Sequence, residues 1–280
     1  MTTRTTPSRR AALAALLAAG LLPAAAHASD GGPAELAPLG KPPRTAAMIL
    51  ADAVKAVGSE AAWKAHKNVH MKLEMTFLGM GISGQAEHFS TKSDQSLLVT
   101  DMPGMGAARQ GTNGKVFWSQ DPINGQRLLT GAEKDWARIE AAWNPELRAD
   151  ELYKSVEVKP DPSRPDLECL LFTPHEAPPV TDCYDAKTHL QVSQKGTEPT
   201  PQGDTPFTST LKDWRDVGGL KMPYAVETQA GPITFTARLT DVKFDVPMDE
   251  KMFDPPSGVG DAGAKPAKAK GKPKARAKKP

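Results

Sequence analysis

The sequence is poor in the residue patterns that enzyme chemistry usually requires. It has two cysteines in 280 residues and no C-x-x-C motif, which argues against a redox centre or a cysteine zinc site. It contains no G-x-S-x-G nucleophile elbow and no H-E-x-x-H metal motif. Gly79, Gly81 and Gly84 separate predicted β segments and open no helix, so they do not form a phosphate-binding loop. We therefore expect no enzyme activity, no cofactor and no metal.

Two groups of residues could supply metal ligands, but a simpler role is favoured for each. His66 and His70 are four residues apart, but His70 belongs to a predicted strand, so two solvated histidines are the better interpretation. Thioethers of an exported protein can bind cuprous copper, although adaptable packing explains clustered methionines more simply. The methionines concerned are Met71, Met75, Met80, Met102 and Met105.

The first 28 residues have the form of a secretory signal peptide. A basic start that includes Arg9 and Arg10 precedes an apolar run over 11–22, and residues 26–28 read A-H-A, a small-x-small cleavage site. We expect cleavage after Ala28 and a periplasmic location. Adjacent arginines also fit twin-arginine export, but they are common in ordinary signals, and Sec export is favoured. No later stretch is long and apolar enough to cross a membrane.

Charge is unevenly distributed along the chain. Residues 257–280 hold eight basic residues, one acidic residue and no large apolar side chain after Val259, a composition typical of disorder. Of the 35 Lys and Arg and the 33 Asp and Glu, 24 and 32 fall between the two ends, so the body carries a net charge of −8. A basic arm on an acidic body favours an anionic envelope polymer or lipid headgroups as partner. A solubilising tail without a partner is equally favoured, and export argues against nucleic acid.

The body follows a linker and begins with a helix. Residues 29–44 are rich in Pro and Gly, and residues 45–256 form one expected domain, which we predict to be a monomer. Apolar residues recur at helical spacing from Thr45 to about Lys67. After Asn68 the period becomes two, which predicts a strand with one apolar face. The residues on that face are Val69, Met71, Leu73, Met75 and Phe77.

A second helix is predicted over Ala132–Trp143, where Trp136 and Ile139 fall on one apolar stripe. The other segments predict about eleven short antiparallel strands. In the last of them the apolar phase shifts near Thr240, which predicts a β-bulge. The expected fold class is α+β, mainly antiparallel β, in a single barrel-like sheet.

The two cysteines flank a predicted hairpin. Cys169 and Cys183 are centred on Glu176, in the middle of the turn segment 174–179, so they fall opposite each other. An oxidising compartment and this register favour a disulfide. A metal or redox role is disfavoured because no further ligand lies at a suitable spacing.

Three turn-and-strand motifs resemble one family. Residues 113–122 read NGKVFWSQDP, residues 216–223 read DVGGLKMP and residues 246–253 read VPMDEKMF. With the signal peptide and the order of helices and strands, residues 45–255 resemble the exported LolA/LolB-like outer-membrane lipoprotein-sorting (lipoprotein carrier) family. The resemblance implies an unclosed β half-barrel whose concave apolar face is covered by helices and holds an acyl chain.

The same resemblance implies which side chains line such a cavity. Two of them, Trp136 and Ile139, would belong to a helical lid. The implied cavity residues are Met71, Leu73, Met75, Phe77, Trp118, Trp136, Ile139, Phe235 and Leu239. The expected function is non-enzymatic periplasmic binding or carriage of a lipid or lipoprotein acyl chain. The alternative is an envelope scaffold or sensor module that is tethered by its basic tail and transports no ligand.

Overall fold

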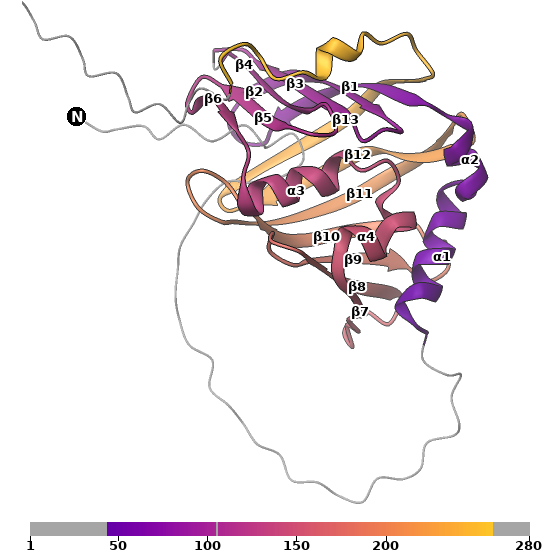
Figure 1. The fold of residues 1–280 in the computed structure, drawn as a ribbon. Coiled ribbons are helices and arrows are strands. Elements are labelled where there is room, and N and C mark those ends of the chain that lie inside the picture. The colour runs from indigo at the N-terminus through magenta and orange to yellow at the C-terminus, as the bar shows by residue number, and fades with distance from the viewer. Residues whose placement is uncertain (1–43, 105, 260–280) are drawn as a thin grey trace, which may run out of the picture.

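A computed structural model describes residues 44–104 and 106–259, shown in Figure 1. These residues form one antiparallel sheet of thirteen strands in the order β6-β5-β4-β3-β2-β1-β13-β12-β11-β10-β9-β8-β7. The first six strands are β1 (Asn68–Phe77), β2 (Ile82–Thr91), β3 (Ser96–Met102), β4 (Gly106–Thr112), β5 (Phe117–Asp121) and β6 (Gly125–Leu128). The other seven are β7 (Tyr153–Val158), β8 (Leu167–Pro174), β9 (Val180–Asp185), β10 (Gln191–Glu198), β11 (Thr205–Val217), β12 (Leu220–Ala230) and β13 (Ile233–Phe244).

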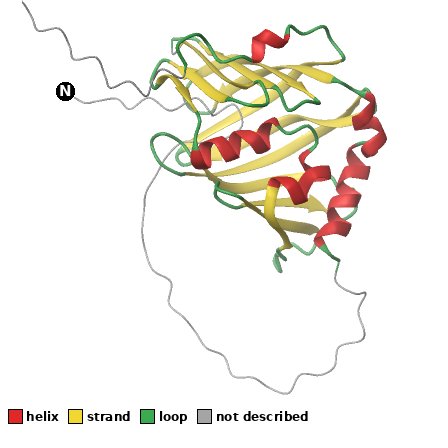
Figure 2. Cartoon of the chain, viewed as in Figure 1, coloured by secondary structure: helices red, strands yellow, loops and turns green. Residues whose placement is uncertain are grey.

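The helices are short and most of them lie on one side of the sheet (Figure 2). They are α1 (Ala46–Val57), α2 (Ser59–Ala65), α3 (Gly131–Ala141), η1 (Pro145–Arg148), α4 (Ala149–Leu152) and η2 (Glu250–Phe253). Within the described residues, no helix has the length and apolar character needed to cross a membrane.

The order of the strands explains why the sheet stays open. Strands β1 to β6 form a meander that ends at one edge, and α3, η1 and α4 carry the chain across to β7 at the other edge. Strands β7 to β13 then return, and β13 pairs with β1. In the part of the chain that the structure describes, β6 and β7 lie at opposite edges and do not pair with each other. The sheet is therefore an unclosed half-barrel. The predicted fold class is confirmed, with thirteen strands instead of about eleven, since even the four-residue β6 pairs with its neighbour.

The first helix differs from the prediction because Gly58 divides it. The expected single helix ends at Val57 and a separate helix, α2, begins at Ser59. Gly58 has φ 146, and a Cβ atom at this position would lie 2.3 Å from the carbonyl oxygen of Gly219. The close approach of the β11–β12 turn therefore requires glycine here. The second predicted helix is also shorter than expected and ends at Ala141.

The bulge predicted in the last strand is confirmed. Lys72 of β1 pairs with Asp241, but the next residue, Leu73, pairs with Leu239, so Thr240 is the extra residue. The Thr240 hydroxyl donates a 3.2 Å hydrogen bond to the carbonyl oxygen of Lys72. The bulge keeps both Leu73 and Leu239 on the concave face while the strand bends.

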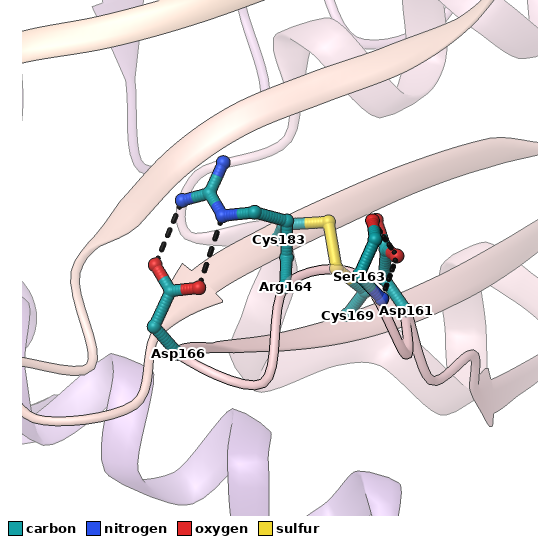
Figure 3. The surroundings of a disulfide bond; sticks show 6 residues. All are labelled: Asp161, Ser163, Arg164, Asp166, Cys169 and Cys183. Carbon is teal, nitrogen blue, oxygen red and sulfur yellow. Dashed lines mark hydrogen bonds and ion pairs between the residues drawn. A yellow bond between two sulfur atoms is a disulfide. The ribbon is translucent and has the colours of Figure 1, made fainter.

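The disulfide is also confirmed. Cys169 and Cys183 are direct partners in the β8–β9 pair and are covalently linked. Figure 3 shows the loop that precedes β8 beside this bond, with Ser163 against Asp161 and Arg164 against Asp166.

Several expectations fall outside the described residues. The signal peptide (1–28), the linker apart from Arg44, and the basic tail beyond Val259 are not among them. The cleavage site and the proposed partner of the tail therefore stay predictions.

Candidate functional site

A pocket of about 250 Å³ lies on the concave face, between the β1–β5 half of the sheet and α3. The helix α3 spans the two halves of the sheet (Figure 1). Its Ala137 and Ala141 pack against Phe117 of β5. Its Trp136 packs against Phe207 of β11 and against residues of β9 and β12. One helix therefore crosses the concave face and contacts both the β1–β6 half and the β7–β13 half of the sheet. The pocket is the part of the space beneath it that stays unfilled.

One side of the pocket is aliphatic and incompletely covered. Leu73, Leu98 and Leu239 are each half-buried, although their strands are central in the sheet. The apolar lining consists of Met71, Leu73, Leu98, Ala108, Phe117, Ala137, Ala141, Met222, Pro223, Val226 and Leu239. Half-buried aliphatic groups on a concave face are a surface that an apolar ligand can cover.

The other side of the pocket, toward β4, β5 and β6, carries hydrogen-bonding groups. Arg127 forms a bidentate ion pair with Glu133 of α3, with nitrogen–oxygen distances of 2.6 and 2.8 Å. Asp121 accepts hydrogen bonds from the backbone N–H groups of Ile123 and Asn124 in the β5–β6 turn. The polar lining consists of His88, Ser96, Thr100, Arg109, Gln110, Thr112, Ser119, Asp121, Asn124, Arg127 and Glu140, with the backbone of Gly111.

His88 of β2 belongs to this polar lining. Its Nε2 lies 2.9 Å from the hydroxyl oxygen of Ser96. Burial lowers the pKa of His88 to about 4, because the imidazolium would lose its hydration in the pocket. His88 is therefore neutral near pH 7 and adds no charge to the site.

A buried carboxylate fixes α3 over the sheet. Asp135 accepts hydrogen bonds from the backbone N–H groups of Glu176 (2.6 Å) and Ala177 (3.0 Å) in the β8–β9 turn, and from Arg138 (2.8 Å). Burial opposes ionisation of Asp135, but these donors outweigh it and hold its pKa below the ordinary value. Arg138 also donates to the carbonyl oxygen of Leu152 at 2.9 Å. Asp135 and Arg138 therefore hold α3 against the β8–β9 turn and against α4.

The structure places three of the expected cavity residues in this pocket. Met71, Leu73 and Leu239 line it from β1 and β13. Met75, Phe77 and Phe235 lie on the same strands but nearer the β1–β2 turn, where they pack together with Met102 and are almost fully buried. That cluster is part of the core and does not line the pocket.

The three remaining expected residues lie outside the pocket lining. Trp118 points to the opposite face of the sheet, where it packs with Leu97 and Phe253 of η2. Trp136 packs against β9, β11 and β12 and so holds α3 on the β7–β13 half of the sheet. Ile139 is half-buried on α3, next to Glu140, which does line the pocket.

The two histidines considered as metal ligands have separate partners. His66 Nδ1 lies 2.8 Å from Asp245, and His70 Nε2 lies 2.6 Å from Glu87 on the neighbouring strand. In residues 44–104 and 106–259, no group of three or more His, Cys, Asp or Glu side chains is arranged to hold a metal ion.

Sequence reasoning missed the polar residues of the pocket, above all Ser119 and Arg127. Phe117 and Ser119 alternate with Trp118, so strand period alone puts them on one face. The sequence does not show which face is concave. Only the position of α3 reveals that the Phe117 face is the pocket face.

The fold has known counterparts. No protein-family model matches the sequence, and a search of curated proteins found no match. A LolA superfamily protein from Nitrosomonas europaea is similar in structure, with a TM-score of 0.53, 13% identity and coverage of 76% of this chain and 98% of that one. A DUF1329 family protein from Desulfovibrio piger gives a TM-score of 0.52, 12% identity and coverage of 74% and 95%. At these identities the similarity shows the fold, and this chain has a LolA-like fold.

Proposed function

We propose that this protein is a periplasmic, non-enzymatic carrier that binds an acyl chain of a lipid or lipoprotein in the pocket under α3. The observation that carries the proposal is the row of half-buried aliphatic side chains, Leu73, Leu98 and Leu239, around an unfilled pocket. Ordinary cores are packed with few voids larger than a water molecule. The LolA-like fold and the motifs of the sequence support the same function.

The size of the pocket limits what it can hold as it stands. An apolar cavity of about 150 Å³ accommodates a molecule such as benzene. The pocket of about 250 Å³ is larger, so it takes a short acyl chain or the end of a longer one. Covering the exposed aliphatic area would supply the binding free energy, at about 25 cal/mol per Å² of apolar surface buried. We propose Met71, Leu73 and Leu239 as direct contacts of the chain.

Filling the pocket with a protein side chain tests this function. Leu73→Trp should occupy the space and abolish displacement of a fluorescent fatty acid, while Leu78→Trp, at the exposed β1–β2 turn, should leave it unchanged. Circular dichroism and urea unfolding establish that both variants fold. Native mass spectrometry of protein purified from a cell envelope should show a lipid adduct on the wild type. Unchanged binding by Leu73→Trp, or the absence of both adduct and probe binding in the wild type, refutes the proposal.

A further inference from the structure

The pocket has two chemically different ends. Aliphatic groups of β1, β12 and β13 line one end. Most of the hydrogen-bonding groups come from the strands β3 to β6 at the other end, where Leu98, Ala108 and Phe117 are apolar exceptions. A ligand that satisfies both ends must carry a polar group at the end of an apolar chain. The polar residues then indicate which polar group this is.

Ser119 is the first of these residues. Its side chain faces the pocket and only 6% of the residue is exposed. Its hydroxyl oxygen is buried and has no hydrogen-bond partner in the part of the chain that the structure describes. Buried polar groups in folded proteins are nearly always paired, so an unpaired hydroxyl that faces a cavity indicates a partner on the ligand.

Arg127 is the second residue and lies directly opposite Ser119 in the β5–β6 pair. Directly paired residues have Cβ atoms about 5 Å apart, so both side chains can reach one ligand atom. Both terminal nitrogens of the Arg127 guanidinium bond to Glu133, whereas its Nε is buried and, among the described residues, has no partner. Arg127 therefore keeps one unused donor, the Nε–H group, in a residue that lines the pocket.

The charges around these two donors favour an uncharged acceptor. Glu133 already neutralises Arg127, and the neighbouring Asp121 carboxylate adds negative charge. His88 is neutral near pH 7.

Arg109 also lines the pocket, but it pairs with Val99, which packs on the convex face, so its side chain points away from the concave face. A carboxylate or phosphate would therefore find no unpaired cation on the concave lining, which is costly in a buried site. A carbonyl oxygen needs only hydrogen-bond donors.

We infer that the pocket recognises an acyl chain linked as an uncharged ester or amide, whose carbonyl oxygen accepts hydrogen bonds from the Ser119 hydroxyl and the Arg127 Nε–H. The chain then extends toward Met71, Leu73 and Leu239. This inference rests on the proposed function, because it assumes that the pocket holds an acyl chain. It adds the chemical class of the head and two residues that select it.

The test compares two ligands of equal chain length, monodecanoylglycerol and decanoate, in competition with a fluorescent probe at pH 7.5. The wild type should bind the ester about tenfold more tightly than the carboxylate, the ratio expected for one or two good hydrogen bonds. Ser119→Ala should lose most of this preference. Arg127→Lys, which keeps a cation for Glu133 but lacks the Nε–H, should also reduce it. Ser90→Ala, a buried serine that does not line the pocket, should keep it.

Stability of the ligand-free protein provides a second readout. Removing an unpaired hydroxyl leaves no partner behind, so Ser119→Ala should unfold at the same urea concentration as the wild type or at a higher one. A clear loss of stability would mean that the hydroxyl has a structural partner, and would overturn the inference. Equal binding of ester and carboxylate, or a preference for decanoate, would overturn it while leaving the proposed function intact. Binding of neither ligand, together with no probe binding, would instead refute the proposed function.

Discussion

The indole Nε1 of Trp118 donates a 3.0 Å hydrogen bond to the carbonyl oxygen of Phe253, 135 residues later in the chain. Both residues are almost fully buried, and the bond ties β5 to η2 on the convex face of the sheet. The convex face is therefore covered at this point by a short C-terminal helix. Trp118, the largest aromatic residue of the NGKVFWSQDP motif, therefore packs in the apolar cluster on the convex face and does not line the pocket.

Trp118→Phe should lower the free energy of unfolding by about 1–3 kcal/mol, because the buried carbonyl of Phe253 loses its donor while most of the packing is kept. Urea unfolding of the purified protein measures the change. Trp214→Phe is the matched control: its Nε1 donates to the carbonyl oxygen of Gln191 at 3.2 Å, but the side chain is only half-buried, so the loss should be smaller. A loss for Trp214→Phe that equals or exceeds the loss for Trp118→Phe would contradict this assignment.

The position of Trp118 shows where sequence reasoning reaches its limit. Period-two patterns, the register of the two cysteines and the phase shift at Thr240 are local signals, and each was confirmed. The pattern around Trp118 also identifies two faces correctly, but it does not say which of them is concave. That depends on η2 and α3, whose contacts join residues far apart in sequence. Trp136 shows the same limit. The apolar side chains of α3 divide between the β1–β6 half and the β7–β13 half of the sheet, and the helical period alone does not tell which half each one contacts.

The disulfide predicts a measurable dependence on redox conditions. It closes a ring between residues 14 apart, and a loop of this length contributes about 3 kcal/mol in the chain-entropy model. The double variant Cys169→Ala/Cys183→Ala should therefore unfold at a lower urea concentration than the oxidised wild type. Adding reductant should lower the urea midpoint of the wild type toward that of the variant and leave the midpoint of the variant unchanged. Equal midpoints for the oxidised wild type and the variant would show that the cross-link does not stabilise the fold.

Asp135→Ala should detach α3 from the β8–β9 turn. The change leaves the buried N–H groups of Glu176 and Ala177 without an acceptor, so we expect a loss of about 3 kcal/mol at pH 7, measured by urea unfolding. Because the folded-state pKa of Asp135 lies below its unfolded value, its stabilisation is present above about pH 4 and is lost as the pH falls further. The difference in unfolding free energy between Asp135→Ala and the wild type should therefore become smaller below about pH 4.

Asp161→Ala is the control for this prediction. Asp161 also accepts a backbone hydrogen bond, from Ser163, but it lies in an exposed loop and should have little effect. If both variants behave alike, the anchoring role of Asp135 is wrong.

Asp182 should make the protein less stable as the pH rises toward neutrality. This carboxyl lies on β9 opposite Leu170 of β8, on the side of the sheet that α1 covers. One of its oxygens is buried without a partner among the described residues. Burial is the main cause that raises its pKa to about 7, and the nearby Glu146 carboxyl of η1 adds to the effect, whereas a hydrogen bond with Gln194 opposes it. Tyr153 and Tyr184 face the same group and supply no positive charge.

The sign of the pH dependence follows from this raised pKa. In the unfolded chain the carboxyl ionises near pH 4, whereas in the folded chain it keeps its proton until about pH 7. The stabilisation is therefore complete below about pH 4 and is lost between about pH 4 and 7, by up to about 4 kcal/mol. Asp182→Asn keeps the shape but cannot ionise, so its unfolding free energy should fall less than that of the wild type between pH 4.5 and 7.5. Asp185→Asn on the same strand is the control, because hydrogen bonds from Thr188 hold the pKa of Asp185 below its ordinary value and it stays ionised across this range. Parallel pH profiles for the wild type and Asp182→Asn would show that Asp182 is ionised in the folded protein at all of these pH values.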